Sequence, residues 1–117
     1  FDCGIVSYSN GIKMSVLEVK QETLELYGAV SEQTVCEMVK GVLTISGADI
    51  AVSVSGIAGP NSDNTDKPVG LIYLAVSDGK KTIVKKLNNQ FTTDVRNSNR
   101  ISASDEALNL ILKMIGE

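Results

Sequence analysis

The feature that most constrains the fold is an abrupt change in hydrophobic period near residue 48. In residues 31–47 the apolar side chains recur three and four positions apart, which is the spacing of an amphipathic helix. Ser31 is a favourable N-cap and Gly47 a favourable C-terminal residue, so the pattern predicts a helix between them. Residues 50–55 follow as a β-rich run, Ile-Ala-Val-Ser-Val-Ser. The change predicts a strand that is covered on at least one face by helices.

Shorter segments flank this helix and strand on both sides. Residues 2–8 predict a strand, and residues 21–27 predict a short helix that ends at Gly28. Residues 69–76 and 82–87 predict an antiparallel hairpin across the turn at 77–80, with Lys85 and Lys86 protecting a sheet edge.

Two more helices complete the expected order. One is capped by Ser9 or Asn10 and carries Ile12, Val16, Leu17 and Val19. The other is the last element of the chain, and its predicted buried stripe is Ile101, Leu108, Ile111, Leu112 and Ile115. The order of elements predicts an α/β fold, a three-layer α/β/α sandwich with a mixed β-sheet, in a single domain over residues 1–117.

Composition removes several classes of chemistry. The 117 residues include no histidine and no tryptophan, and the net charge is −3. A catalytic site would therefore rely on Lys, Tyr, Ser, Cys or carboxylates in place of an imidazole. A mildly acidic chain with 4% aromatic residues also argues against a nucleic-acid partner.

The two cysteines, Cys3 and Cys36, lie far apart and outside any metal-ligand pattern. We interpret them as reduced, mostly buried thiols and expect neither a metal nor a cofactor. No apolar run approaches the length that spans a membrane, and no signal peptide is evident. We therefore expect a cytoplasmic protein with no membrane partner.

A first candidate for chemistry is the pair Tyr8 and Lys13. The lysine falls in the predicted first turn of a helix, where the macrodipole disfavours a cation. An amine near a phenol stabilises the phenolate, so the two side chains are a plausible proton relay without histidine. The alternative is an exposed lysine and a half-buried tyrosine with no chemical role.

The second candidate is the loop that begins with Gly56-Ile57-Ala58-Gly59-Pro60, directly after a predicted strand. Glycines at this position allow a ligand to approach backbone N–H groups. The loop leads to another strand through Lys67-Pro68-Val69-Gly70, so it matches neither the P-loop nor the dinucleotide-binding pattern. A ligand loop and a structural turn are both open interpretations.

The third candidate is Arg96 and Arg100, four residues apart near the start of the last predicted helix. Two cations there repel each other and oppose the helix dipole, and a phosphate between them would relieve both effects. The alternative is a solvated basic face.

These candidates occur in the order and spacing of one known family. The chain resembles the C-terminal domain of the competence/damage-inducible protein CinA, the nicotinamide-nucleotide amidase family. The matching stretches are residues 4–10 with Lys13, residues 28–31, 47–49, 55–60 and 67–70, and Arg96, Arg100, Ala107 and Leu108. Together they cover essentially the whole chain.

The resemblance implies that the chain hydrolyses the carboxamide of nicotinamide mononucleotide, giving nicotinate mononucleotide and ammonia, with a small-molecule nucleotide as the partner. Family members use a serine nucleophile assisted by lysine and tyrosine, which implies catalytic roles for Tyr8 and Lys13. The implied substrate-binding residues are Ser9, Asn10, Ser55, Gly56, Ile57, Ala58, Gly59, Arg96 and Arg100. Similar proteins form homo-oligomers, so the resemblance implies one here.

One part of the family pattern is absent from these 117 residues. The family's nucleophile lies in a Ser-Cys-Thr-Gly-Gly stretch upstream of the part matched by Phe1, and no such stretch occurs in the chain. We therefore expect a domain that is truncated at its N-terminus and lacks a strand and a helix. The alternative hypothesis is a non-catalytic nucleotide-binding or regulatory module, and a purely structural interaction domain is a third.

Overall fold

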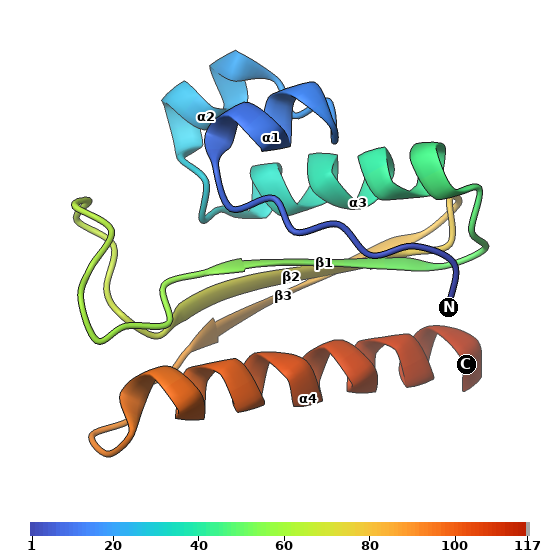
Figure 1. Ribbon diagram of the computed structural model, residues 1–117. Helices are drawn as coiled ribbons and strands as arrows, with labels where there is room; N and C mark the ends of the chain where they lie inside the picture. The colour runs from blue at the N-terminus through green and yellow to red at the C-terminus, as the bar shows by residue number, and fades with distance from the viewer. Residues whose placement is uncertain (117) are drawn as a thin grey trace.

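The computed structural model describes residues 1–116, which form four helices and three strands (Figure 1). The elements in chain order are α1 (Asn10–Ser15), α2 (Gln21–Tyr27), α3 (Glu32–Ser46), β1 (Ala51–Gly56), β2 (Leu71–Ser77), β3 (Thr82–Asn88) and α4 (Val95–Gly116).

The sheet has the order β1-β2-β3, and both pairs of strands are antiparallel. The register places Ser53 opposite Ala75 and Ser55 opposite Tyr73. β3 forms one edge of the sheet, and Lys85 and Lys86 lie on it as expected. Lys85 pairs with Glu106 of α4 at 3.4 Å, which joins the exposed edge to the helix below it.

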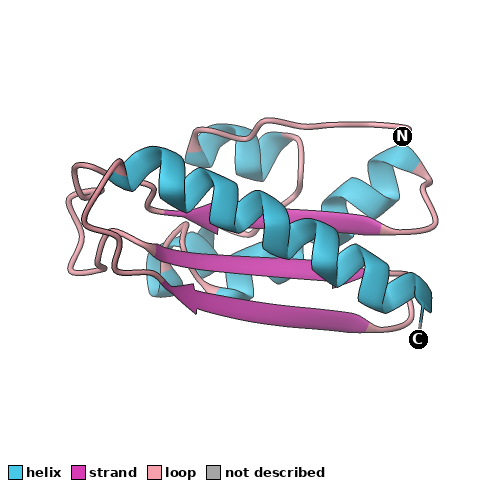
Figure 2. Cartoon of the chain, turned by 90° about the horizontal axis from the view of Figure 1, so that it is seen from below, coloured by secondary structure: helices cyan, strands magenta, loops and turns pink. Residues whose placement is uncertain are grey.

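Helices cover both faces of the sheet and create the three layers (Figures 1 and 2). On one face, α1, α2 and α3 bury a cluster centred on Leu17, Val35 and Val39. On the other face, Leu110 of α4 packs on Ile72, Leu74 and Val76. β2 is covered on both sides, which explains its nearly continuous apolar sequence.

Several expectations are confirmed. The chain has the α/β fold in three layers, α2 ends at Gly28, and α3 lies between its cap Ser31 and Gly47. The Ser31 side chain accepts a hydrogen bond from the Thr34 amide, and Gly47 adopts a left-handed conformation with φ of 66°. The hairpin of β2 and β3 is also present.

The predicted strand over residues 2–8 and the mixed sheet are wrong for the described residues. Residues 1–8 are extended and lie along the free edge of β1 in both views, yet they form no ladder with it (Figures 1 and 2). Their side chains still alternate: Cys3, Ile5 and Ser7 are partly buried, whereas their neighbours are exposed. The segment therefore has the periodicity of a strand without a hydrogen-bonded partner.

The first helix is shorter than expected. Ser9 is its N-cap, accepting a hydrogen bond from the Ile12 amide, but α1 ends at Ser15. Leu17 and Val19 lie beyond it and are buried in the core below. In so short a helix Lys13 belongs to the last turn, where the dipole favours a cation, so the predicted conflict with the macrodipole is wrong.

The buried face of α4 also differs from the prediction. Of the expected stripe only Ile111 packs against the core. The other four side chains are 61–66% exposed: Ile101, Leu108, Leu112 and Ile115. The sheet is contacted instead by Ala103, Ala107, Leu110 and Met114. Small residues on that face let the helix approach β2 closely, whereas hydrophobic periodicity gives most weight to the larger side chains.

Both cysteines are free thiols, as expected, and both are partly buried. Burial raises the pKa of the Cys36 thiol, so that side chain stays protonated near neutral pH. Within residues 1–116, no helix combines the length and the apolar character that a membrane crossing requires.

The close packing of α3 gives a test of the fold. A Cβ at Gly41 would overlap the backbone carbonyl of Leu17, which cannot rotate away as a side chain could. We expect Gly41→Ala to lower the free energy of unfolding by at least about 2 kcal/mol, although alanine is the better helix former. Gly11→Ala is the control, because its Cβ would meet only the Ser9 hydroxyl at 3.7 Å. Urea denaturation measures both, and equal stability of the two variants would contradict the packing.

A cleft at the end of the sheet

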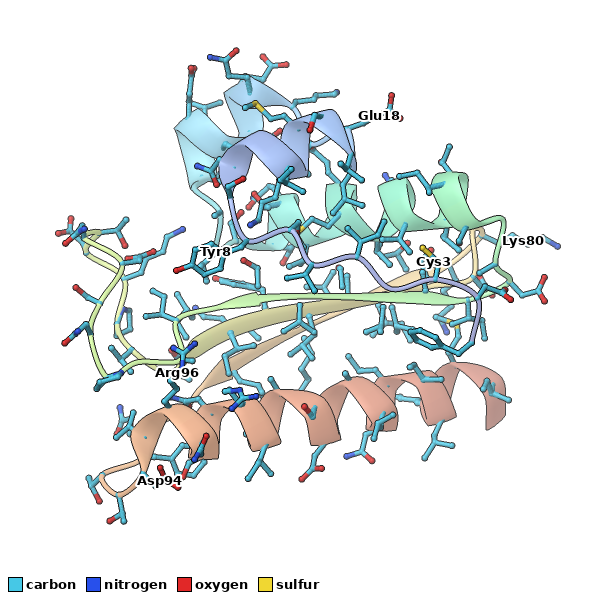
Figure 3. The ribbon with its side chains drawn as sticks, viewed as in Figure 1. Cys3, Tyr8, Glu18, Lys80, Asp94 and Arg96 are labelled. Atoms are coloured by element: carbon cyan, nitrogen blue, oxygen red, sulfur yellow. The ribbon has the colours of Figure 1, made fainter. Side chains whose placement is uncertain are left out.

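A cleft of about 650 Å³ lies where β1 ends and the long loop begins. Segments that are distant in sequence form its walls: residues 5–8 with Lys13, the turn at 29–30, residues 54–59, residues 61–63 of the long loop, and Arg96 at the start of α4. Figure 3 shows the labelled side chains of Tyr8 and Arg96 at this same end of the sheet. The cleft therefore collects residues from all three candidate regions of the sequence.

Lys13 is the buried cation of the cleft. Its side chain is only 6% exposed, and its Nζ donates a hydrogen bond of 2.5 Å to the Ser7 carbonyl. The short helix α1, capped by Ser9, turns the chain back so that the lysine reaches residues 5–8. Burial lowers the pKa of the Lys13 ammonium below its usual 10.5. A lysine in this environment gives up a proton more readily than one in water.

Tyr8 lines the same cleft from the extended N-terminal segment, and it is 93% exposed. No hydrogen bond joins its hydroxyl to another group in the described part of the chain. The alternative of an exposed lysine and a half-buried tyrosine is wrong in both halves, because the lysine is buried and the tyrosine exposed. The tyrosine hydroxyl is thus free to meet a ligand.

The Gly56–Gly59 turn forms the floor of the cleft, and its glycines are sterically required. At Gly56 a Cβ would come within 2.8 Å of the Ile72 side chain. At Gly59 the backbone has φ of +91°, and a Cβ would meet Val69 at 2.7 Å. Ile57 between them is buried with Val30 and Leu71, which anchors the turn in the core.

Two side chains of α4 hold this turn from below. Arg96 donates to the Gly59 carbonyl at 2.9 Å, and Asn99 donates to the Ala58 carbonyl at 2.9 Å. Arg96 also lines the cleft. The first of the two predicted arginines therefore belongs to the cleft.

The far end of the loop is attached to the turn between α2 and α3. Lys67 donates through Nζ to the carbonyls of Tyr27 and Val30, both at 2.5 Å. Ser55 donates to the Ala29 carbonyl at 2.7 Å, so its hydroxyl also serves this turn. These bonds join the opposite wall of the cleft to the loop.

Three of the predicted residues are not among the cleft's lining residues. Ser9 caps α1, and Asn10 is the first residue of that helix. Arg100 is exposed and donates to the Asn97 side chain at 3.2 Å, one turn further along α4 than Arg96.

Sequence reasoning missed Asn99 and Lys67. Asn99 is 1% exposed, and a polar side chain on the sheet-facing side of a helix is its only signal in the sequence. The stretch Lys67-Pro68-Val69-Gly70 marks the end of the long loop in the sequence, but spacing cannot predict that the Lys67 amine bonds to a turn 37 and 40 residues away.

A second hollow of about 520 Å³ lies along the first half of β1, towards the opposite end of the sheet from the cleft. Its walls are residues 1–5, residues 48–52, and Ile111 and Ile115 of α4. Residues 1–5 and the start of β1 thus face each other across a hollow, and no backbone hydrogen bond joins them in the described part of the chain.

Fold and cleft together define a three-layer α/β domain with a cleft at one end of its sheet. The family model for the CinA C-terminal domain matches residues 1–115. The chain belongs to this family.

Among named relatives, the chain is 48% identical over 113 residues to the nicotinamide-nucleotide amidohydrolase PncC of Enterobacter agglomerans. That match covers 97% of this chain and 68% of the relative. A putative competence-damage inducible protein of Acetivibrio thermocellus is 44% identical over 117 residues, covering 99% of this chain and 28% of the relative.

Solved structures of the family have the same fold. The competence damage-inducible protein A of Klebsiella pneumoniae superposes with a TM-score of 0.87 at 33% identity, covering 96% of this chain and 68% of that one. For the competence/damage inducible protein of Agrobacterium tumefaciens the TM-score is 0.85 at 36% identity, covering 92% and 65%. The chain thus spans 68% of the Enterobacter agglomerans relative, 28% of the Acetivibrio thermocellus one and 20–26% of further curated relatives that it matches.

The buried lysine makes a prediction about stability and pH. Because the folded state lowers the pKa of Lys13, the unfolded chain binds more protons between that lowered pKa and 10.5. The free energy of unfolding should therefore gain a contribution that rises with pH in this window, by at most about 1.4 kcal/mol per pH unit. Lys13→Met should lose this contribution.

Urea denaturation from pH 8 to 10.5 measures the difference. Lys80→Met is the control, because Lys80 lies exposed in the turn between β2 and β3. The same pH slope in wild type and Lys13→Met would show that the amine is not desolvated.

Proposed function

We propose that this chain forms the substrate-binding and proton-transfer part of a nicotinamide-nucleotide amidase. The reaction converts nicotinamide mononucleotide and water to nicotinate mononucleotide and ammonia. The observation that carries the proposal is the buried amine of Lys13 in a cleft shared with Tyr8 and the glycine turn. The relative named nicotinamide-nucleotide amidohydrolase, at 48% identity, supports this substrate.

The chemistry of the cleft fits amide hydrolysis without histidine. A lysine with a lowered pKa can accept the proton of an attacking hydroxyl, and the Tyr8 hydroxyl can pass a proton to the departing nitrogen. In the first step an Oγ–C bond forms and the C–N bond breaks, so ammonia leaves and an ester remains. Water then attacks the ester carbon and releases the carboxylate, and the serine hydroxyl recovers its proton.

We propose that the serine nucleophile comes from a segment other than residues 1–117. The family's Ser-Cys-Thr-Gly-Gly stretch is absent from the sequence. The hollow lies along the first half of β1, and residues 1–8 form no ladder with the free edge of that strand. An added strand there would carry a residue at its end towards Lys13 and Tyr8.

Arg96 is the residue we assign to the phosphate of the substrate. One of its N–H groups is engaged by Gly59, which fixes the planar guanidinium at the rim of the cleft. The role of Arg100 stays a prediction, and so does homo-oligomer formation. A nucleotide-binding module without catalysis is the alternative function, because it would use the same cleft and need no serine.

Substitution of the two catalytic candidates tests the proposal. In the full natural protein that contains these residues, Tyr8→Phe and Lys13→Met should each lower kcat for ammonia release by about 10²- to 10⁴-fold. The KM for nicotinamide mononucleotide should change little, because the groups act on protons and not on the phosphate. Tyr27→Phe is the matched control, since that side chain lies on α2 outside the cleft.

The outcomes separate the two functions. Nucleotide binding without ammonia release in wild type would indicate the non-catalytic module. Full turnover in both variants would remove Tyr8 and Lys13 from the mechanism.

A further inference from the structure

Three successive backbone carbonyl groups in the glycine turn each accept a hydrogen bond from a donor elsewhere in the domain. Ile57 accepts from the Gly70 amide at 2.8 Å, Ala58 from the Asn99 side chain at 2.9 Å, and Gly59 from Arg96 at 2.9 Å. Gly70 and Asn99 do not line the cleft, so the first two carbonyls point away from it.

The direction of these carbonyls fixes the direction of the neighbouring amides. Across a trans peptide the N–H group points opposite to the carbonyl of the preceding residue. The amides of Ala58 and Gly59 therefore point towards the cleft, which both residues line. Neither amide has an acceptor within residues 1–116. Two adjacent free N–H groups of this kind form a small anion-binding concavity.

The buried position of Asn99 lowers the stability of the fold, and packing alone does not explain why a polar side chain occupies it. Its side chain is 1% exposed, its Nδ2 is used by Ala58, and its Oδ1 is buried with no hydrogen-bond partner among the described residues. A buried orphan acceptor costs about 1–3 kcal/mol. An apolar side chain would fill the same position without that cost, but it could not hold the Ala58 carbonyl.

We propose that Asn99 is a positioning residue for substrate binding. It turns the Ala58–Gly59 peptide so that the Gly59 amide, beside the guanidinium of Arg96, donates to the phosphate of the substrate. The identity of the anion as a nucleotide phosphate rests on the proposed function, whereas the orientation of the peptide rests on the hydrogen bonds alone. The site thus binds a phosphate through one backbone amide and one arginine.

Two nearly isosteric variants test this role. Asn99→Leu and Asn99→Asp both remove the donor to Ala58, and thermal melts establish which of them folds as wild type does. Asn109→Leu is the matched control, because Asn109 is an exposed asparagine on the same helix. The probes are nicotinamide mononucleotide for kinetics and inorganic phosphate for binding, both with the full natural protein.

We expect each folded Asn99 variant to raise KM by at least about tenfold, with kcat within twofold of wild type. The bond that is lost joins the Gly59 amide to the charged phosphate, and it contributes equally to the ground state and the transition state. In wild type the Gly59 amide resonance should shift on titration with phosphate, and in the variants this shift should be lost. An unchanged KM, or a loss in kcat at constant KM, would overturn the proposal. If wild type releases no ammonia, the proposed function fails, but the phosphate titration still decides the role of Asn99.

Discussion

The structure depends on the burial of β2 between two helical layers. Leu74, Ala75 and Val76 are fully buried because α3 covers one face of this strand and α4 the other. β1 is aligned by its register with β2, so the end of β1, where the glycine turn begins, is fixed relative to both layers. The packing of the core therefore determines the geometry of the cleft together with the loop sequence.

The glycine turn illustrates how this geometry is transmitted. Ile57 is buried against β2, while Arg96 and Asn99 reach the next two residues from α4. On the opposite side Ser55 and the distant Lys67 hold the turn between α2 and α3. Each wall of the cleft is thus bonded to a layer of the sandwich, which is an effective way to pre-organise a ligand site.

Local signals predicted the elements that are stabilised locally. α3 has a cap, a regular apolar period and a terminal glycine, and its bounds agree with the prediction. Residues 2–8 have the period of a strand, but pairing requires a neighbour, which a local pattern cannot supply. The predicted buried face of α4 is wrong for a similar reason. Ala103 and Ala107 pack against the sheet because they are small enough to fit closely, whereas Leu108 and Leu112 are exposed to solvent. Lys67 and Asn99 are recognisable only through their distant partners.

Without histidine, proton transfer near neutral pH requires a group whose pKa is shifted from its ordinary value. The fold provides one by burying Lys13 on a short helix against residues 5–8, where its amine has the Ser7 carbonyl as partner. This burial already lowers the pKa of the amine in the open cleft. Tyr8, on the same cleft, projects into solvent. The hollow beside β1 lies along the first half of that strand and does not include Lys13, so a segment that filled it would reach the cleft only by running along the whole free edge of β1.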